Sequence, residues 1–271
     1  MSTTETKGTA LITGASTGIG RATASLLARK GYNVFGGVRS PERVQPMPGV
    51  ELVRVDVRDD VSVKACVDHV LDRSRRIDVL VNNAGYSIIG AVEETTIEQA
   101  QGLFDTNVFG VMRMIRVVLP AMRRAGSGLI VNVSSTAGFL PAPFMGLYAS
   151  SKHAIEGLSE SLDHEVRQFG IRVALVEPGF TNTPMGTNSQ QAAEPVAAYF
   201  EQSGRATSAI MDKLKAGPSP ESVAEIILRS IEKSFQLRHP AGRKAGFLSL
   251  ARRFMPAALV DRGIRKECNL T

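Results

Sequence analysis

Short, nearly uninterrupted apolar runs alternate with helix-like stretches along most of this chain. Residues 78–81 and 129–133 are clear examples of such runs. Strands that are apolar along their whole length are typical of a parallel sheet covered on both faces. The pattern predicts strands at residues 8–13, 32–38, 51–56, 77–82, 128–134, 171–177 and 235–239.

Between these runs, apolar residues recur at the spacing of amphipathic helices. The period is clearest over residues 148–168, where Ile155, Leu158, Leu162 and Val166 share one side. We therefore expect a doubly wound α/β fold of Rossmann type, with a mainly parallel seven-stranded sheet, helices on both faces and ligands at the carboxyl ends of the strands. Helices are predicted at residues 18–30, 60–74, 96–125, 148–168 and 219–234.

The 271 residues, 43% of them hydrophobic, can bury a sizeable core. No repeat, low-complexity tract or clear linker divides them, so we expect one domain over residues 1–271. Residues 184–218 are irregular and mixed. In a fold whose site lies above the sheet, this stretch is expected to form a substrate lid, with a packed surface excursion as the alternative.

The N-terminus and the cysteines indicate where the protein works. Met1–Thr6 is polar and predicts no signal peptide, and no run approaches the roughly 18 apolar residues of a membrane span. Cys66 and Cys268 lie far apart without the spacing of metal ligands. We therefore expect reduced thiols, no metal site and a cytoplasmic location.

The formal net charge of +6 belongs to the C-terminal part of the chain. Residues 235–271 hold eight basic and two acidic residues, so residues 1–234 are neutral and nucleic acid is not expected as a partner. Residues 241–271 form a basic extension with apolar residues at helical spacing, and Pro256 should divide it into two helices. We expect this extension to pack on its own domain; contact with a membrane surface is the alternative.

A glycine-rich turn follows the first predicted strand. Residues 13–20 read Thr-Gly-Ala-Ser-Thr-Gly-Ile-Gly, and a helix is predicted to follow. Gly14, Gly18 and Gly20 let the backbone turn tightly and let a pyrophosphate approach the amides at the helix N-terminus. This T-G-x-x-x-G-x-G spacing differs from the G-x-G-x-x-G fingerprint, but its strand–turn–helix context predicts nucleotide binding.

The end of the second predicted strand bears on the choice between NAD and NADP. An acid about 20 positions after the glycine turn binds the ribose 2′-hydroxyl, whereas an arginine accommodates a 2′-phosphate. This window has no acid but holds Arg39, with Ser40 as a further donor. NADP(H) is therefore the expected cofactor, with NAD(H) as the second choice. Asp56 is expected either to accept a hydrogen bond from the adenine amino group or to cap the turn before Asp59.

Tyr148 and Lys152 lie four residues apart at the head of a predicted helix, so they share one face. The reference pKa of a phenol is about 10, and an ammonium group one turn away should lower it. The pair is expected to donate and accept a proton; a buried tyrosine followed by a surface lysine is the alternative. The serines after the fifth predicted strand can donate to a substrate oxygen as charge builds on it.

Two further motifs end predicted strands. Residues 82–85 read Asn-Asn-Ala-Gly, where small residues let a cofactor lie against the backbone and asparagines can tie neighbouring strands together. Pro178-Gly179 makes a turn, and threonines after it are expected to meet a nicotinamide carboxamide. Asn107 lies inside a predicted helix, where asparagine has low propensity and can mark a kink.

The order and spacing of these motifs closely resemble the short-chain dehydrogenase/reductase family over roughly residues 7–240. Within that family, Gly37-Val38-Arg39 and the basic extension look most like the 17β-hydroxysteroid dehydrogenase-like and retinol dehydrogenase-like branch. The motifs that carry the resemblance are Gly14, Gly18, Gly20, Asn82, Asn83, Ala84, Gly85, Asn107, Ser135, Tyr148, Lys152, Pro178 and Gly179.

The resemblance implies catalytic roles for four residues. Tyr148 would be the acid in carbonyl reduction and the base in alcohol oxidation, and Lys152 would lower its pKa and bind the nicotinamide ribose. Ser135 would hold the substrate oxygen, and Asn107 would hold a water that relays protons to Lys152. Thr17 stands where many NADP-preferring relatives carry a basic residue, which leaves Arg39 to select NADP. The implied cofactor contacts are Gly14, Ser16, Thr17, Gly18, Ile19, Arg39, Asp56, Val57, Asn83, Ala84, Gly85, Tyr148, Lys152, Pro178, Gly179, Thr181 and Thr183.

The resemblance implies hydride transfer between NADP(H) and a ketone, an aldehyde or a secondary alcohol. The expected pocket wall has no charged side chain, which predicts an apolar steroid-like, retinoid-like or acyl-chain substrate. The alternatives are a 3-oxoacyl thioester reductase, a non-catalytic NADP-binding protein and a membrane-surface protein. By analogy with the family, a homodimer or homotetramer is expected through residues 96–125 and 148–168. The wall residues are Tyr86, Ile88, Phe139, Leu140, Phe144, Met145, Met185 and Phe200.

Overall fold

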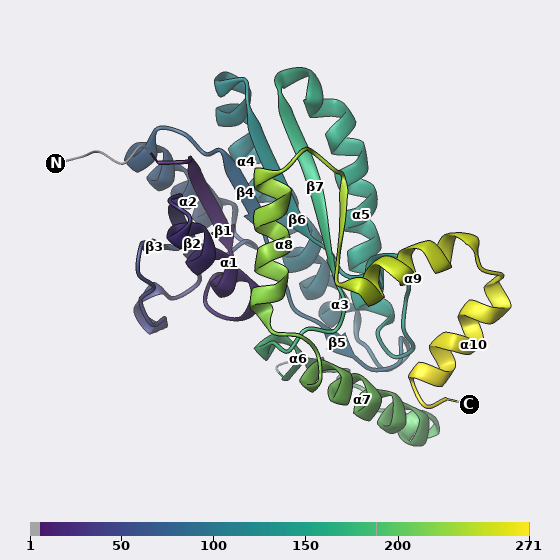
Figure 1. Cartoon of the computed structure of the whole chain (residues 1–271). Helices are drawn as coiled ribbons and strands as arrows, with labels where there is room; N and C mark the ends of the chain where they lie inside the picture. Colours follow the sequence, from purple (N-terminus) through teal and green to yellow (C-terminus); the bar gives the residue numbers. More distant parts are fainter. Residues whose placement is uncertain (1–5, 188, 271) are drawn as a thin grey trace.

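The computed structural model describes residues 6–187 and 189–270, and five residues of the polar N-terminal stretch lie outside that range. A seven-stranded sheet forms its centre, in the order β3-β2-β1-β4-β6-β7-β9 (Figure 1). Every neighbouring pair is parallel, which confirms the doubly wound α/β fold. The strands are β1 Thr9–Thr13, β2 Asn33–Val38, β3 Val50–Arg54, β4 Val79–Asn82, β6 Gly128–Val133, β7 Ile171–Pro178 and β9 Arg238–Ala241.

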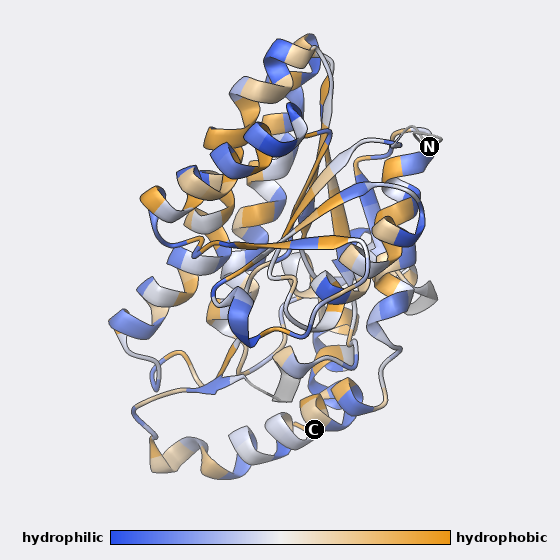
Figure 2. Ribbon diagram, turned by 90° about the vertical axis from the view of Figure 1, so that its left-hand side faces the viewer, coloured by the Kyte–Doolittle hydropathy of each residue, from blue (hydrophilic) through white to orange (hydrophobic). Residues whose placement is uncertain are grey.

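Helices cover both faces of this sheet, and two apolar cores lie between the layers. Because successive strand residues point to opposite faces, Leu11 of β1 joins one core while Ala10 and Ile12 join the other. The first core includes α2 Asp60–Ser74, α4 Gly110–Ala125 and α5 Gly146–Val166. The second includes α1 Gly18–Arg29 and α8 Pro220–Glu232. Figure 2 shows the strands as the mainly hydrophobic interior of the molecule.

The helix predicted over residues 96–125 is interrupted in its middle. It begins with α3 Ile97–Phe104, where Thr96 and Gln99 form a capping box, and it continues as α4. Between them, Asp105–Phe109 form a π-helical turn that contains Asn107. The predicted single helix is therefore interrupted by a π-helical turn at Asn107, and such turns often occur at functional sites.

Residues 184–218 contain more regular structure than the sequence predicts. They form α6 Pro184–Thr187, a two-residue strand β8 Gln190–Gln191 that pairs with β5 Ile88–Ile89, and α7 Phe200–Lys215. The expectation of an irregular stretch is thus wrong for α7. Two of its three buried residues are the small side chains Ala206 and Ala209, which give a weak helical period.

The C-terminal extension forms two helices, α9 Arg243–Phe254 and α10 Ala257–Glu267, separated before Pro256 as predicted. Figure 1 shows the pair projecting beside the sheet, with α10 returning towards α7. An ion pair of 2.7 Å joins Lys213 of α7 to Glu267. No helix among the described residues is long and apolar enough to cross a membrane.

The packing of α9 corrects the expectation for its apolar face. Ala245 is buried against the molecule, whereas Phe247, Leu250 and Phe254 are 66%, 62% and 74% exposed. The extension therefore rests on its domain through small and half-buried side chains. The large apolar residues that give α9 its helical period are thus mostly exposed and not packed against the domain.

Candidate active site

One cleft of about 1670 Å³ lies at the carboxyl ends of the strands. It is larger than a pocket for one drug-sized ligand, which is about 300–1,000 Å³, so it has room for a dinucleotide and a substrate together. All seventeen residues expected to contact the cofactor line this cleft, and Ser135 lines it as well. Segments up to 169 residues apart in sequence, from Gly14 to Thr183, therefore meet at one site.

The glycine turn has the geometry of an anion-binding site. Gly14 and Gly18 adopt φ angles of +69° and +54°, which side chains rarely adopt. A Cβ on Gly20 would lie 2.3 Å from the carbonyl oxygen of Gly14, so only glycine fits there. Thr17, the N-cap residue of α1, makes no side-chain capping bond. The uncapped amides at the start of α1 fit the pyrophosphate of a dinucleotide.

Asparagines hold this turn to the neighbouring strands, as the sequence predicts. Asn83 Nδ2 donates to the carbonyl oxygens of Thr13 and Gly14, at 3.0 Å and 3.2 Å. Asn82 Nδ2 donates to Asn132 Oδ1 on β6 at 2.9 Å. The turn that would carry the phosphates is thus fastened to β4 by side-chain bonds.

Two arginines and one carboxylate lie at the ends of β2 and β3. Asp56 accepts a hydrogen bond of 3.0 Å from the backbone of Arg58 and forms an ion pair of 2.9 Å with its guanidinium. These bonds hold the pKa of Asp56 below its usual range. Arg58 lines the cleft, and no sequence motif pointed to it. The Arg39 guanidinium also lines the cleft, and the described part of the chain supplies it with no hydrogen-bond or ion-pair partner.

Tyr148 lies in the first turn of α5 and is 8% exposed. Burial raises the pKa of its phenol, and a hydrogen bond with Ser135 lowers it by less. The Ser135 hydroxyl is held at the end of β6, where it accepts from Ala137 N at 3.1 Å and donates to Pro178 O at 3.4 Å. The net direction is opposite to the lowered pKa that the sequence predicts, because desolvation of the phenol has the larger effect.

Lys152 lies one turn after Tyr148, with its Nζ 5.7 Å from the centre of the phenol ring. The ammonium group donates to Val133 O at 2.8 Å. Burial lowers the pKa of Lys152 to about 8, and the negative charge of Glu156 opposes that shift. The pair shares one face as predicted, but burial changes the pKa of the lysine as well as that of the tyrosine.

Asn107 lies behind the cleft and is not among its lining residues. Its Nδ2 donates to Tyr86 O at 2.9 Å and to Ser151 Oγ at 3.2 Å, and its Oδ1 accepts from Tyr86 N at 3.1 Å. Ser151 Oγ in turn donates to the carbonyl oxygen of Tyr148 at 2.7 Å. Asn107 therefore joins the loop after β4 to the helix that carries Tyr148.

Half of the expected pocket wall is correct. Tyr86, Leu140, Met145 and Met185 line the cleft, whereas Ile88, Phe139, Phe144 and Phe200 do not. Alternation along β5 places Ile89 in the wall instead of Ile88. Phe144 packs edge-on against Tyr199, and Phe200 is 62% exposed at the start of α7.

The outer wall comes from α7, which lies within the stretch expected to form a lid, and from the C-terminal extension, which the sequence did not place there. Apolar side chains of α7, α9 and α10 line it, among them Ile210, Leu214, Leu248, Ala251, Met255 and Leu259. The expectation of a wall without charge is wrong at this outer end, which also carries Asp212, Lys213, Arg252, Lys266 and Glu267.

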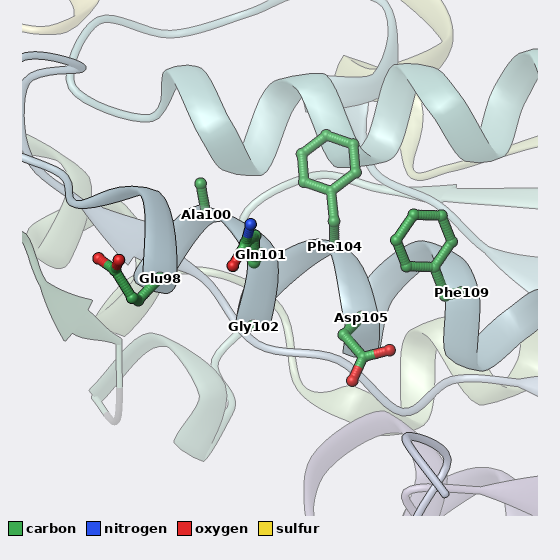
Figure 3. Close-up of a pocket in the computed structure, with 7 residues that line it drawn as sticks. All are labelled: Glu98, Ala100, Gln101, Gly102, Phe104, Asp105 and Phe109. Carbon is green, nitrogen blue, oxygen red and sulfur yellow. The ribbon is translucent and has the colours of Figure 1, made fainter. Parts of the chain in front are cut away.

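A second hollow, of about 640 Å³, lies on α3 and the π-helical turn. Figure 3 shows Phe104 and Phe109 among its lining side chains. It shares no lining residue with the cleft and holds none of the expected catalytic or cofactor residues.

Comparison with known proteins identifies the family to which this chain belongs. The family model described as short chain dehydrogenase matches residues 8–194. The chain belongs to the short-chain dehydrogenase family. It is an NAD(P)-dependent oxidoreductase of this family, acting on carbonyl or alcohol groups.

Individual relatives support the assignment to the short-chain dehydrogenase family. The chain is 44% identical over 178 residues to a 3-ketodihydrosphingosine reductase of Bacteroides thetaiotaomicron, covering 66% of this chain and 65% of that one. A short-chain dehydrogenase structure from Streptomyces avermitilis has a TM-score of 0.82 at 35% identity, covering 97% and 99% of the two chains. A Brucella melitensis 3-ketoacyl-(acyl-carrier-protein) reductase complexed with NADH has a TM-score of 0.74 at 25% identity, covering 87% and 96%.

Proposed function

We propose that this enzyme uses NADPH to reduce ketones or aldehydes carried on apolar chains. One observation carries the proposal: Tyr148, Ser135 and Lys152 line one cleft together with the expected cofactor contacts and with apolar side chains of the outer wall. The buried phenol stays protonated at neutral pH, so it can act as the proton donor in reduction.

Each group has one role in this reaction. A bound nicotinamide supplies the hydride. Tyr148 donates a proton to the carbonyl oxygen, while the Ser135 hydroxyl donates a hydrogen bond to the same oxygen as negative charge builds on it. Lys152 lies close enough to Tyr148 for its positive charge to stabilise the phenolate left after proton transfer. Asn107 bonds the main chain of Tyr86 and the Ser151 hydroxyl, and in this way it fixes the position of α5 relative to the loop after β4.

Arg39 supports the preference for NADP. Arg39 lines the cleft together with Asp56, whose charge is matched by Arg58. A 2′-phosphate would therefore meet an arginine with no competing partner among the described residues. Thr17 supplies no positive charge on the opposite side of the site.

The substrate class follows from the outer wall. Apolar side chains of α7, α9 and α10 extend the cleft well beyond the reacting groups, which suits a long apolar chain. The relative named for 3-ketodihydrosphingosine supports such a substrate.

A 3-oxoacyl thioester reductase is the second candidate. Lys213, Arg252 and Lys266 at the outer end of the cleft could meet the phosphate of a carrier arm, and the Brucella relative is named for such a substrate. Asp212 and Glu267 lie at the same end and reduce its positive charge.

A panel of matched substrates tests the proposal. NADPH oxidation is measured with a long-chain aliphatic 3-ketone, a steroid ketone, retinal and a 3-oxoacyl thioester of equal chain length, and each assay is repeated with NADH. We expect the highest kcat/KM for an apolar ketone or aldehyde with NADPH. A kcat/KM at least tenfold higher for the thioester would select the second candidate, and no oxidation with any member would contradict both.

A further inference from the structure

A buried group of charged side chains lies directly behind Lys152. Glu156 follows Lys152 by one turn on α5, and Glu177 is the penultimate residue of β7. Both are buried, and Glu177 is 0% exposed. We propose that Glu156 and Glu177 form a buried carboxyl pair, bridged by Arg238, whose charge tunes the catalytic ammonium group of Lys152 one helical turn away.

Arg238 holds the two carboxylates together from the edge strand. Its Nη1 bonds both Glu156 Oε2 and Glu177 Oε1, so one nitrogen serves two acids. Its Nη2 pairs with Glu160 at 2.7 Å, on the half-exposed side of the group. The three acids come from two turns of α5 and from β7, and the shared arginine brings them to one point.

Three buried oxygens in this group have no hydrogen-bond partner among the described residues: Glu156 Oε1, Glu177 Oε2 and Ser134 Oγ. A Cβ placed on Gly138 would lie 2.8 Å from Ser134 Oγ and 2.9 Å from Glu156 Oε1, so these two atoms surround the same small space. Buried polar atoms normally have partners. A proton shared between the carboxyls, or a water seated at Gly138, would satisfy these oxygens.

Glu160 is half-exposed, so solvent screens its charge, and the charges of the buried part of the group are balanced only when one acid is protonated or Lys152 is charged. Two ionised carboxylates against one arginine leave a net negative charge, which Lys152 neutralises. Accordingly, burial and the charge of Glu156 raise the pKa of Glu177 to about 7, and Glu156 raises the pKa of Lys152 against desolvation. Besides Arg238, Lys152 and the half-exposed Glu160, no charged side chain comes from the turn Thr136–Gly138 packed against the pair, and His239 on β9 bonds Gln236 O.

The pair therefore works as a positioning device for the proton-transfer step. Near neutral pH, Glu177 loses its proton before Lys152 does, and the added negative charge keeps Lys152 protonated to higher pH. This keeps an ammonium group beside Tyr148 through the upper part of the working range. The inference rests on the proposed role of Lys152 in stabilising the phenolate.

Three glutamine variants test the pair. Glu156→Gln removes the charge nearest Lys152, and Glu177→Gln imitates the protonated acid; Glu160→Gln is the matched control, since it contacts the same arginine from the half-exposed side. In reduction assays, kcat falls as the pH rises into the alkaline range. Glu156→Gln and Glu177→Gln should move this fall to lower pH by about one unit. Glu160→Gln should leave the pH of this fall unchanged. If kcat falls at the same pH in Glu156→Gln and in Glu160→Gln, the proposal is wrong.

Two readouts do not depend on turnover. Infrared difference spectra between pH 6 and pH 9 should show a protonated carboxyl that disappears at high pH and is absent in Glu177→Gln. NMR titration of 13C-labelled lysines should show a lower pKa of Lys152 in Glu156→Gln. If Glu156→Gln does not fold, Glu156→Asp replaces it. Because this variant keeps the negative charge, the pH at which its kcat falls should stay close to that of the wild type. If the pKa of Lys152 is the same in Glu156→Gln and in the wild type, and no protonated-carboxyl band is seen, the proposed carboxyl pair is wrong, even if the proposed reaction is correct. If instead only the proposed role of Tyr148 is wrong, the Lys152 shift and the carboxyl band should both still be seen.

Discussion

At the scale of single residues, burial determines how the groups at the bottom of the cleft ionise. Desolvation raises the pKa of Tyr148 and lowers that of Lys152, so the phenol stays protonated while the ammonium group is close to titrating. The sequence identified both residues from their spacing. It could not give the direction of the tyrosine shift, because burial and the Ser135 contact depend on the folded chain.

The lowered pKa of Lys152 predicts a pH limit for reduction. A lysine with a pKa of about 8 is charged below that pH and neutral above it. We expect kcat for carbonyl reduction to be level between about pH 6 and pH 7.5 and to fall as pH rises through 8, because the neutral amine cannot stabilise the phenolate. A pH series at saturating substrate measures this limit; a level profile up to pH 10 would contradict the role of Lys152.

Arg39 offers a test of cofactor choice. Arg39→Ala should raise KM for NADP(H) about 10- to 100-fold, since a charge-assisted bond contributes about 1.5–3 kcal/mol, and should change KM for NAD(H) less than threefold. Arg43→Ala is a control, because Arg43 is exposed and outside the cleft. Equal changes for the two dinucleotides would refute the assignment.

At the scale of elements, α5 connects the chemistry to the sheet. Its start carries Tyr148 and Lys152, and its last turn carries Asp163, which is buried and bonds Arg167, Arg172 and the backbone N–H of Val173. Desolvation of Asp163 would raise its pKa, but these bonds outweigh it and lower the pKa to about 2. The carboxylate thus joins α5 to β7, whose far end carries Glu177.

Asp163→Asn should reduce the free energy of unfolding at pH 7 by about 2 kcal/mol, from a pKa lowered by roughly two units. The folded pKa lies below the unfolded value, so this stability is present above about pH 4 and lost as pH falls through 2. Urea unfolding at several pH values measures it. The control Asp68→Asn removes an exposed pair with Lys64 and should change the free energy by less than about 0.5 kcal/mol. Similar losses in the two variants would contradict the account.

The elements that the sequence predicted are those with strong local periods. Six strands of the main sheet were placed to within a few residues from short runs rich in apolar residues, whereas β9, Arg-His-Pro-Ala, has no apolar run and shares only Arg238 and His239 with the predicted strand 235–239. β5 and β8 have two residues each, too few for a period, and α7 buries mainly small side chains. The meeting of Glu156, Glu177 and Arg238 joins positions 61 and 82 residues apart, which no local pattern shows.

At the scale of the whole molecule, the cleft is completed by α7 and the C-terminal helices. The basic extension, which the sequence analysis expected to pack on its own domain, supplies Leu248 and Met255 to the outer wall. Assembly through residues 96–125 and 148–168 stays a prediction. The exposed Phe109, beside the second hollow, lies in the first of these segments.

Two leucines of α9 test the role of the extension. Leu248 lines the cleft, whereas Leu250 is exposed and does not. Leu248→Asp should raise KM for an apolar ketone about tenfold, because a carboxylate in the wall must be desolvated when the substrate binds. Leu250→Asp, the same change on the same helix, should alter KM less than twofold. Equal effects of the two substitutions would mean that the extension does not form the substrate wall.

The proton donor is the centre of the account, and one substitution measures it directly. NADPH oxidation with an apolar ketone is compared between the wild type and Tyr148→Phe, with NADPH affinity measured separately by fluorescence. The ring stays and the proton is lost, so we predict that kcat falls by about 10²- to 10⁴-fold while the Kd for NADPH changes less than threefold. A Tyr148→Phe enzyme with wild-type kcat would contradict the account.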